Sequence, residues 1–419
     1  MQAAVIPRFR LLPASATADA RRLVTARALR GFADGFVSVM LASYLHGRGF
    51  TAFEISAVVT GTLLGSAVLT LAVGLMGYRL SRRRLLFAST GLMLATGFGF
   101  ALATNFWVLL AVAVIGTMNP TAGDVSVFLP TEQSLLSEGA ADRDRTSLFA
   151  RYNLSGLFAA ALGSLVVGVP VVIARLEGWP LVEVQRASFL IYALVAAILV
   201  LVYARLTPEG DDAEGREAPR PAAPLREARS IVIRLSLLFS LDAFGGGFVV
   251  QTLITLWLFE RFDMAVSTAG AIFFVSGLLS ALSQLGSPWL AKRIGLINTM
   301  VFTHLPANAF LILAALMPNV YLAIAFLLAR MLLSAMDVPA RQSYTMAVVP
   351  PEERAAAASV TNVPRSLASA FAPLLAGWLL TMGASGGPLI AGGAIKIVYD
   401  LLLLWQFRSH PPPEERRAA

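Results

Sequence analysis

The sequence predicts an all-α membrane protein with twelve transmembrane helices in two pseudo-symmetric six-helix bundles. Three observations carry this prediction: an apolar composition, apolar spans of membrane length, and an internal repeat. Of the 419 residues, 57% are hydrophobic and 14% are charged, with a mean hydropathy of +0.71. Soluble proteins carry about 25% charged residues. Most of this chain therefore has no water-facing side, which excludes a soluble enzyme and a nucleic-acid-binding domain.

A helix needs about 20 mostly apolar residues to cross the hydrocarbon core of a bilayer. Residues 1–22 contain scattered arginines and no apolar core followed by a cleavage site, so we expect a cytoplasmic N-terminal segment and no signal peptide. Charges, prolines and glycines then divide the first half of the chain into six candidate spans, near residues 27–46, 55–77, 84–103, 106–130, 147–173 and 187–204.

A charged, proline-rich stretch at 206–230 separates these spans from a second set and predicts a flexible cytoplasmic linker. The N-terminal bundle is therefore expected at 23–205, the C-terminal bundle at 231–408 and a cytoplasmic tail at 409–419. The spans of the second bundle lie near residues 235–258, 267–290, 296–316, 320–343, 356–381 and 387–407.

The distribution of basic residues predicts the orientation. With both termini in the cytoplasm, 25 of the 33 lysines and arginines fall on the cytoplasmic side and four on the other. Cytoplasmic loops of membrane proteins carry such an excess. We expect a multi-pass protein of an inner or plasma membrane.

An internal repeat relates the two halves. At an offset of 212 residues, Leu29–Val37 aligns with Leu241–Val249, with five of nine residues identical. At an offset of 209, Pro130, Gln133 and Ser134 align with the same residue types. Low-complexity apolar sequence produces chance leucine and alanine matches, but not matched proline, glutamine and serine at one offset. Two parallel halves of six helices are a known layout of transporters.

No catalytic or metal-binding constellation is visible. The absence of cysteine excludes disulfides, thiolate metal sites and a cysteine nucleophile. His46, His304 and His410 are too far apart in sequence to form a metal-ligand pattern. Nothing resembles a nucleotide site apart from a weak glycine pattern at 91–99, inside a span. We therefore expect no enzyme activity and no cofactor.

Several short motifs resemble those of the major facilitator superfamily. Gly74–Arg83 resembles the signature G-x-x-x-D-R-x-G-R-R, and Ala291–Gly295 looks like its degenerate copy. Residues 351–354, Pro-Glu-Glu-Arg, are also typical of that superfamily. Tyr78 and Ser81 depart from the signature, which puts the usual cytoplasmic lock between the halves in doubt. The resemblance implies a secondary transporter that works by alternating access.

Asp, Glu, Lys and Arg inside the spans fall on spans 1, 4, 5, 7, 10, 11 and 12, and are missing from spans 3, 6 and 9. Such residues face a cavity or a partner, because a charge in hydrocarbon costs at least about 2.5–3.5 kcal/mol. In the superfamily, helices 1, 4, 7 and 10 line the central path. One group is expected near the cytoplasmic ends, where it either forms the ion pairs of a cytoplasmic gate or includes a proton carrier: Arg30, Arg79, Arg82, Arg83, Asp124, Glu132, Arg151, Asp242 and Arg341.

A second group is expected along a proton and substrate pathway: Asp34, Gln251, Gln284, Arg330, Asp337 and Arg365. Asp34 is nearest to mid-span and is the best candidate for proton coupling. Arg330 and Arg365 lie deep in their spans, where they either bind an anionic group of the substrate or pair with Asp34 or Asp337.

Three further features have a structural interpretation, and two of them also have a functional alternative. Lys396 and Asp400 are spaced to pair on one helix face. His304 is interpreted as a packing residue with satisfied hydrogen bonds, with a proton carrier as the alternative. The aromatics are interpreted in the same two ways, as packing residues or as contacts to an apolar substrate: Phe36, Tyr152, Phe248 and Trp257.

The leading hypothesis is proton-coupled efflux of small organic compounds, as in drug/proton antiporters, which the glycines and Pro170 of span 5 loosely resemble. The first alternative is a transporter of an organic or inorganic anion or a nutrient, and the second is a non-transporting receptor or scaffold. The expected partners are a small-molecule substrate, a coupling proton and the lipid bilayer, with no nucleic acid and a monomeric chain.

Overall fold

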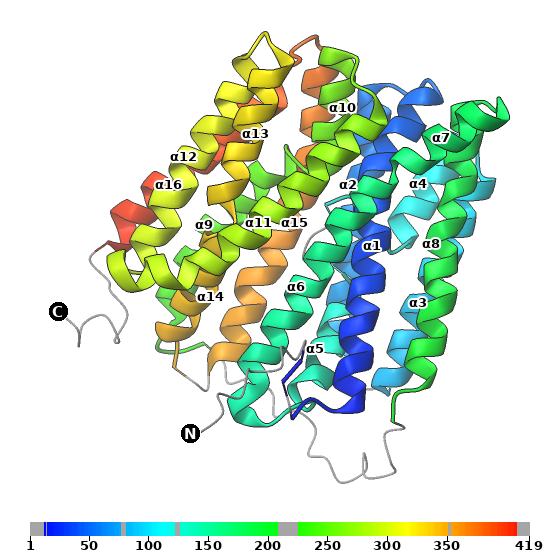
Figure 1. The fold of residues 1–419 in the computed structure, drawn as a ribbon. Helices are drawn as coiled ribbons and strands as arrows, with labels where there is room; N and C mark the ends of the chain where they lie inside the picture. Colours follow the sequence, from blue (N-terminus) through cyan, green and yellow to red (C-terminus); the bar gives the residue numbers. More distant parts are fainter. Residues whose placement is uncertain are drawn as a thin grey trace, which may run out of the picture.

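A computed structural model describes residues 12–13, 15–76, 81–121, 126–207, 225–350 and 353–408. Within these residues the regular elements are all helices. They stand side by side as one bundle, with α1–α8 on one side and α9–α16 on the other (Figure 1).

The first half contains eight helices in the described residues. α1 is 30 residues long and begins at Thr17, whose side chain accepts a hydrogen bond from the backbone of Ala20 and so satisfies one free donor of the first turn. The helices are α1 (Ala18–Gly47), α2 (Ala52–Met76), α3 (Arg82–Leu102), α4 (Phe106–Ile115), α5 (Leu129–Ser137), α6 (Asp142–Val166), α7 (Gly168–Glu177) and α8 (Leu181–Ala204).

The second half repeats this pattern of long and divided helices. Its described helices are α9 (Arg229–Gly247), α10 (Gln251–Phe262), α11 (Val266–Ile294), α12 (Leu296–Leu316), α13 (Val320–Ser334), α14 (Asp337–Ala347), α15 (Arg354–Thr381) and α16 (Gly387–Phe407).

Four of the twelve predicted spans are each divided into two helices. The spans near 147–173, 235–258 and 320–343 are interrupted only briefly, at 167, 248–250 and 335–336. The expectation of a continuous helix over 106–130 is wrong, because α4 ends at Ile115 and α5 begins only at Leu129. Gly116 is extended, and Pro120 lacks a backbone donor and disfavours helical geometry in the residue before it.

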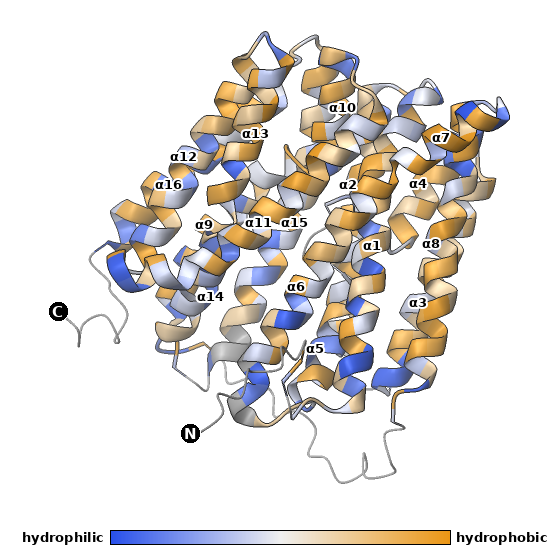
Figure 2. Cartoon of the chain, in the orientation of Figure 1, coloured by the Kyte–Doolittle hydropathy of each residue, from blue (hydrophilic) through white to orange (hydrophobic). Residues whose placement is uncertain are grey.

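The helices have the length and exposure expected in a bilayer. Ten helical stretches of the described chain are long and apolar enough to cross a membrane, and α4 is a shorter apolar helix. α1 and the α4–α5 pair correspond to the other two predicted spans. Large apolar side chains such as Leu176 and Trp405 are 77% and 78% exposed, which is stable only against lipid. In Figure 2, apolar colours dominate the helices and hydrophilic colours gather at several helix ends.

We call the end of the molecule where α1 begins, α8 ends and α9 begins the linker face. The two halves meet most closely toward the other end. There α2 packs on α15 and α6 on α11. A Cβ added at Gly377 of α15 would lie 2.3 Å from Ser56 Oγ of α2, and one at Gly270 of α11 would lie 2.4 Å from the Ser164 carbonyl of α6. Only glycine permits these approaches.

At the linker face, two acids at equivalent positions of the repeat accept hydrogen bonds from the residues just before the first helix of each half. Asp144, near the start of α6, accepts a hydrogen bond of 2.6 Å from Ser15, just before α1. Glu353 precedes α15 and accepts bonds of 2.9–3.1 Å from the backbone N–H groups of residues 226–228, just before α9. The repeat offset of 209 places Asp144 on Glu353, so the Pro-Glu-Glu-Arg motif supplies a cap for a distant helix.

Candidate functional site

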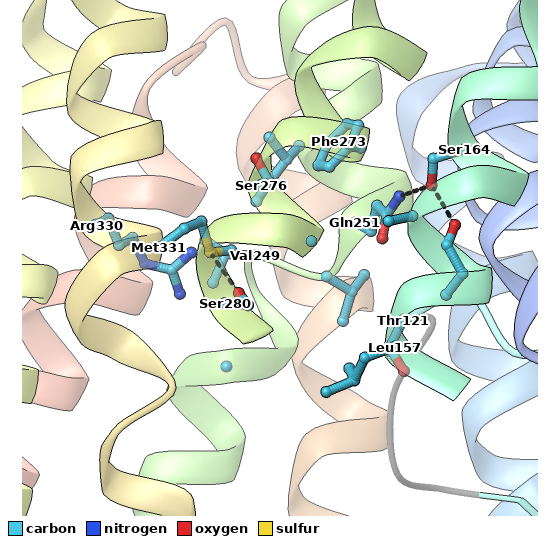
Figure 3. A pocket seen from close by; sticks show the side chains of 16 residues that line it. Thr121, Leu157, Ser164, Val249, Gln251, Phe273, Ser276, Ser280, Arg330 and Met331 are labelled. Atoms are coloured by element: carbon cyan, nitrogen blue, oxygen red, sulfur yellow. Dashed lines mark hydrogen bonds between the residues drawn. The ribbon is translucent and has the colours of Figure 1, made fainter. Parts of the chain in front are cut away.

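A cavity of about 300 Å³ lies between the halves, where α9 ends and α10 begins. Figure 3 shows Arg330 and Met331 of α13 on one wall and Gln251 with Ser164 on the other. The break at 248–250 brings Gln251 to the cavity, where its amide donates a hydrogen bond of 3.1 Å to Ser164 Oγ of α6. This bond joins the second half to the first.

Arg330 is the principal charged group of this cavity. Its residue is 9% exposed, and Nε has no hydrogen-bond partner. It makes no ion pair with the residues that the structure describes, so neither Asp34 nor Asp337 neutralises it. A buried guanidinium without a counter-ion is strongly disfavoured, and it therefore attracts any anion that enters the cavity.

A second cavity of about 180 Å³ adjoins the first, because Thr121, Gly246 and Val250 line both. Asp242 and Lys396 lie on its wall, together with Arg365 of α15. The joined cavities therefore present three basic side chains and one carboxylate to an entering solute.

A buried ion pair stands inside the first half. Glu132 of α5 is fully buried and bonds Arg30 of α1. Tyr152 and Tyr203 donate further hydrogen bonds to the same carboxylate, and the Arg30 guanidinium lies 4.5 Å from the centroid of the Phe128 ring. The carboxylate thus has a charged partner and two hydroxyl donors, as a buried acid requires.

A larger polar cluster stands inside the second half. Asp242 of α9 bonds Lys396 Nζ at 2.5 Å and Arg341 Nη1 at 3.1 Å. Arg341 also lies 3.4 Å from Asp337. The expected pairing of Lys396 with Asp400 is wrong, because Lys396 bonds Asp242 and Asp400 bonds His304 of α12 at 2.8 Å.

The two ion pairs occupy equivalent positions with opposite polarity. The offset of 212 residues places Arg30 on Asp242, and the offset of 209 places Glu132 on Arg341. The first half therefore has its base on the first helix of the repeat, and the second half has its acid there. Each pair joins helices of one half, so a role in a gate between the halves stays a prediction.

Asp34 lies one helical turn after Arg30 in α1. The residue is 6% exposed, and it makes neither a hydrogen bond nor an ion pair with described residues. Arg30, its nearest cation along the helix, is held by Glu132. Asp34 does not line either of the joined cavities.

The arginines after the second span contact other helices of the first half. Arg82 pairs with Glu138 at 3.0 Å, and Arg83 donates a bond of 2.9 Å to the Ala204 carbonyl at the end of α8. Ser81, a departure from the signature, caps α3 by accepting a bond from the Arg84 backbone. Arg79, Tyr78 and Asp124 lie outside the described residues.

The other predicted residues are spread over the molecule. Arg365 lines the second cavity, and Asp337 is buried at the start of α14. Gln284 is half-buried in α11 and lines neither of the joined cavities. Arg151 makes no ion pair within the described chain, and its buried Nη1 has no hydrogen-bond partner. The four aromatics are buried: Phe36, Tyr152, Phe248 and Trp257.

Sequence reasoning missed the small polar residues of the cavity. Ser276 and Ser280 line it from α11, and their spacing of four residues is a signal that places both on one helix face. The amide of Asn308 donates a bond of 3.0 Å to Asp400. Asn308 is spaced four residues from His304, so the same rule pairs them.

The chain resembles known proteins over almost its whole length. It is 24% identical over 423 residues to the uncharacterized membrane protein YJR124C of Saccharomyces cerevisiae, covering 94% of each chain. The nucleoside transporter NupG has a similar structure, with a TM-score of 0.70, 16% identity, and coverage of 94% of this chain and 100% of that one. The xylose transporter XylE from E. coli, in an inward open conformation, gives a TM-score of 0.71 at 14% identity, with 93% and 96% covered.

A family model adds sequence evidence to this shared fold. The model described as Major Facilitator Superfamily matches residues 23–333, which is most of the chain. It extends from α1 to α13 and so crosses from the first half of the repeat into the second. With its two six-span halves and the polar cavity between them, the chain belongs to the Major Facilitator Superfamily and is a secondary transporter, not an enzyme.

Proposed function

We propose that this transporter carries a small organic solute with an anionic group, a carboxylate or a phosphate, and couples its movement to protons. The observation that carries the proposal is Arg330, a buried guanidinium on the cavity wall that makes no ion pair with the described residues. Arginine binds carboxylates and phosphates with two parallel hydrogen bonds, so an anionic solute would supply the partner that the described residues do not.

The shape and lining of the cavity support this class of solute. A volume of about 300 Å³ is at the small end of the range of ligand sites, which begins at roughly 300 Å³. Ser276, Ser280 and Gln251 can hydrogen-bond polar groups, whereas Phe273 and Ile254 offer apolar contact. The N-terminal end of α10 also lies at this wall, and its helix dipole favours negative charge.

The contacts between the halves at the end opposite the linker face support alternating access. Near the end opposite the linker face, Thr252 Oγ1 donates to the Ser38 carbonyl at 2.7 Å and to the Pro120 carbonyl at 3.1 Å, across the two halves. Toward the linker face, a cavity of about 350 Å³ separates α2 from α15. We propose that the linker face is cytoplasmic, that both termini lie there, and that this conformation opens inward from a plasma or inner membrane.

Proton coupling is assigned to Asp34 in the first half. A buried carboxylate without a hydrogen bond or counter-ion readily exchanges its proton when its surroundings change. Asp34→Asn should abolish accumulation driven by a pH gradient and leave exchange of labelled for unlabelled solute intact. Gradient-driven accumulation by this variant at the wild-type level would exclude Asp34 as the carrier.

Efflux of uncharged or cationic organic compounds by proton antiport is the second candidate. Leu157, Phe273 and Met331 form apolar parts of the cavity wall, and these would hold such a compound without help from Arg330. The two candidates differ in their dependence on the charge of Arg330.

A binding screen with the purified protein separates them. The panel contains small carboxylates, phosphates, and uncharged and cationic analogues of equal size, with thermal stabilisation as the readout. For an anion that stabilises the wild type, Arg330→Gln should weaken affinity about 10- to 100-fold, since a hydrogen bond to a charged group contributes about 1.5–3 kcal/mol. Arg175→Gln, at an exposed arginine of α7, is the matched control. Stabilisation by cations alone would favour the second candidate.

A further inference from the structure

The polar cluster of the second half contains a histidine between two carboxylates. His304 of α12 is 3% exposed. Its Nδ1 lies 2.8 Å from Asp400 Oδ1, and its Nε2 lies 3.8 Å from Asp242 Oδ1. A helix that carries no other charged residue thus places a titratable ring in contact with the ions behind the second cavity.

The hydrogen bonds define which ring nitrogen can take an extra proton. Because an ionised Asp400 only accepts hydrogen bonds, Nδ1 must donate to it. Neutral His304 therefore directs the lone pair of Nε2 toward the Asp242 carboxylate. A proton added at Nε2 converts this unfavourable contact of two acceptors into an ion pair.

The charge of Asp400 also favours a proton on His304. Asp400 is fully buried, and its hydrogen-bond partners in the described chain are His304 and Asn308. Within the described chain, no lysine or arginine lies within ion-pair distance of it, whereas Asp242 has both Lys396 and Arg341. A buried carboxylate with only neutral partners is costly, so a proton taken up by His304 would give Asp400 a charged partner.

Lys396 connects this proton to the cavity. Lys396 and Asp242 line the second cavity, and Lys396 Nζ bonds the same Oδ1 atom of Asp242 that His304 Nε2 approaches. An anion that draws Lys396 away leaves Oδ1 without its partner. The N–H of a protonated Nε2 can then replace the lost bond.

We propose that His304 takes up a proton when an anionic solute binds Lys396, so that anion and proton bind together and cross in the same direction. This inference rests on the proposed anionic substrate and adds a second proton site, in the second half, to the one assigned to Asp34. The balance is simple: one proton binds Nε2, one negative charge arrives at Lys396, and no covalent bond between heavy atoms changes. The following charged or titratable groups lie on the helices around His304: Asp242 on α9, exposed Lys292 and Arg293 on α11, Arg330 on α13, Asp337 and Arg341 on α14, Arg365 on α15, and Lys396, Tyr399 and Asp400 on α16.

A variant that keeps His304 as its single histidine tests the protonation of this ring directly. The chain has three histidines, so a His46→Gln/His410→Gln background leaves His304 as the only signal in magic-angle-spinning spectra of 15N-histidine-labelled protein in liposomes. On acidification, His304 should pass from the Nδ1–H tautomer to the doubly protonated ring. In the Asp400→Asn variant, His304 should reach the same protonated fraction only at a lower pH. A ring that stays neutral throughout, or carries its single proton on Nε2, would overturn the proposal.

Transport in proteoliposomes tests the coupling. With an anion identified by the screen, one proton taken up per anion makes wild-type affinity change about tenfold per pH unit. His304→Gln should remove this pH dependence and the gradient-driven accumulation while retaining exchange. Asp400→Asn is a second variant for the same test and keeps the histidine in place. Retention of the pH dependence of affinity and of the gradient-driven accumulation in His304→Gln would refute the coupling. If no anion is bound or transported by the wild type, the proposed function fails, and the spectra still decide the protonation of His304.

Discussion

Exchanging the charges of Arg30 and Glu132 should preserve the stability of the first half, whereas removing either charge should not. The reason is the equivalent pair of the second half, where Asp242 occupies the position of Arg30 and Arg341 that of Glu132. In the second half, the equivalent position between two helices therefore holds an ion pair of the opposite polarity.

The burial of the pair sets the size of the effect. The side chains of Arg30 and Glu132 are 2% and 0% exposed, so solvent screens neither charge. Removing one partner of such a pair costs about 3–5 kcal/mol, because the other charge stays buried and unpaired. Glu132→Gln should therefore lower the free energy of unfolding by about this amount. The double variant Arg30→Glu/Glu132→Arg should recover at least about 2 kcal/mol, as expected for coupled neighbours in one network.

The free energy of unfolding can be followed in mixed micelles by the fluorescence of the six tryptophans. Arg151→Gln is the control, since Arg151 makes no ion pair in the part of the chain that the structure describes, and its loss should not destabilise the protein. A double variant as unstable as the two single charge removals combined would refute the reasoning and show that the tyrosine donors to Glu132 impose one polarity.

Two other predictions concern the ends of the bundle. Burial raises the pKa of Glu353, but the backbone N–H groups of residues 226–228 and the charge of Arg226 lower it more, so the pKa lies below its ordinary value of 4.5. At neutral pH, Glu353→Gln should have a lower melting temperature than Glu227→Gln. The difference between the two melting temperatures should vanish as the pH falls through the lowered pKa of Glu353. A constant difference down to pH 2 would contradict the role of Glu353 as a cap. Gly377→Val should force apart α2 and α15, because a Cβ there lies 2.3 Å from Ser56 Oγ, and should increase labelling of a Thr252→Cys variant by an impermeant maleimide on intact cells. Gly168→Val is the control and should not increase this labelling, because a Cβ at Gly168 would lie 3.5 Å from its nearest neighbour. Equal labelling in the Gly377→Val and Gly168→Val backgrounds would count against a tight closure.

The sequence predicted the fold class well, and its errors have local causes. Apolar length alone identified the spans, and the repeat identified their grouping. The continuous span over 106–130 failed because hydropathy averages across Gly116 and Pro120, which stop the helix without lowering the apolar content. The same averaging conceals the break at 248–250, which brings Gln251 to the cavity.

The candidate site was predicted in part. Arg330, Gln251 and Arg365 do line the joined cavities, because a charged or amide side chain deep in an apolar span has few other places to go. The partners of these ions could not be read from spacing. Lys396 and Asp400 are correctly spaced to pair, yet each finds a closer partner on another helix, Asp242 and His304 respectively.

A membrane protein of two repeated halves could be predicted from the chain alone, because composition, span length and repeat do not depend on how the helices pack. Which charges meet depends on that packing. Helix packing brings together residues about 100 positions apart, such as Arg30 with Glu132 and Asp242 with Arg341, and leaves Arg330 at the cavity without an ion pair to any described residue. Pairing between ions depends on distances of a few ångströms across helices, and hydropathy and periodicity carry no information about those distances.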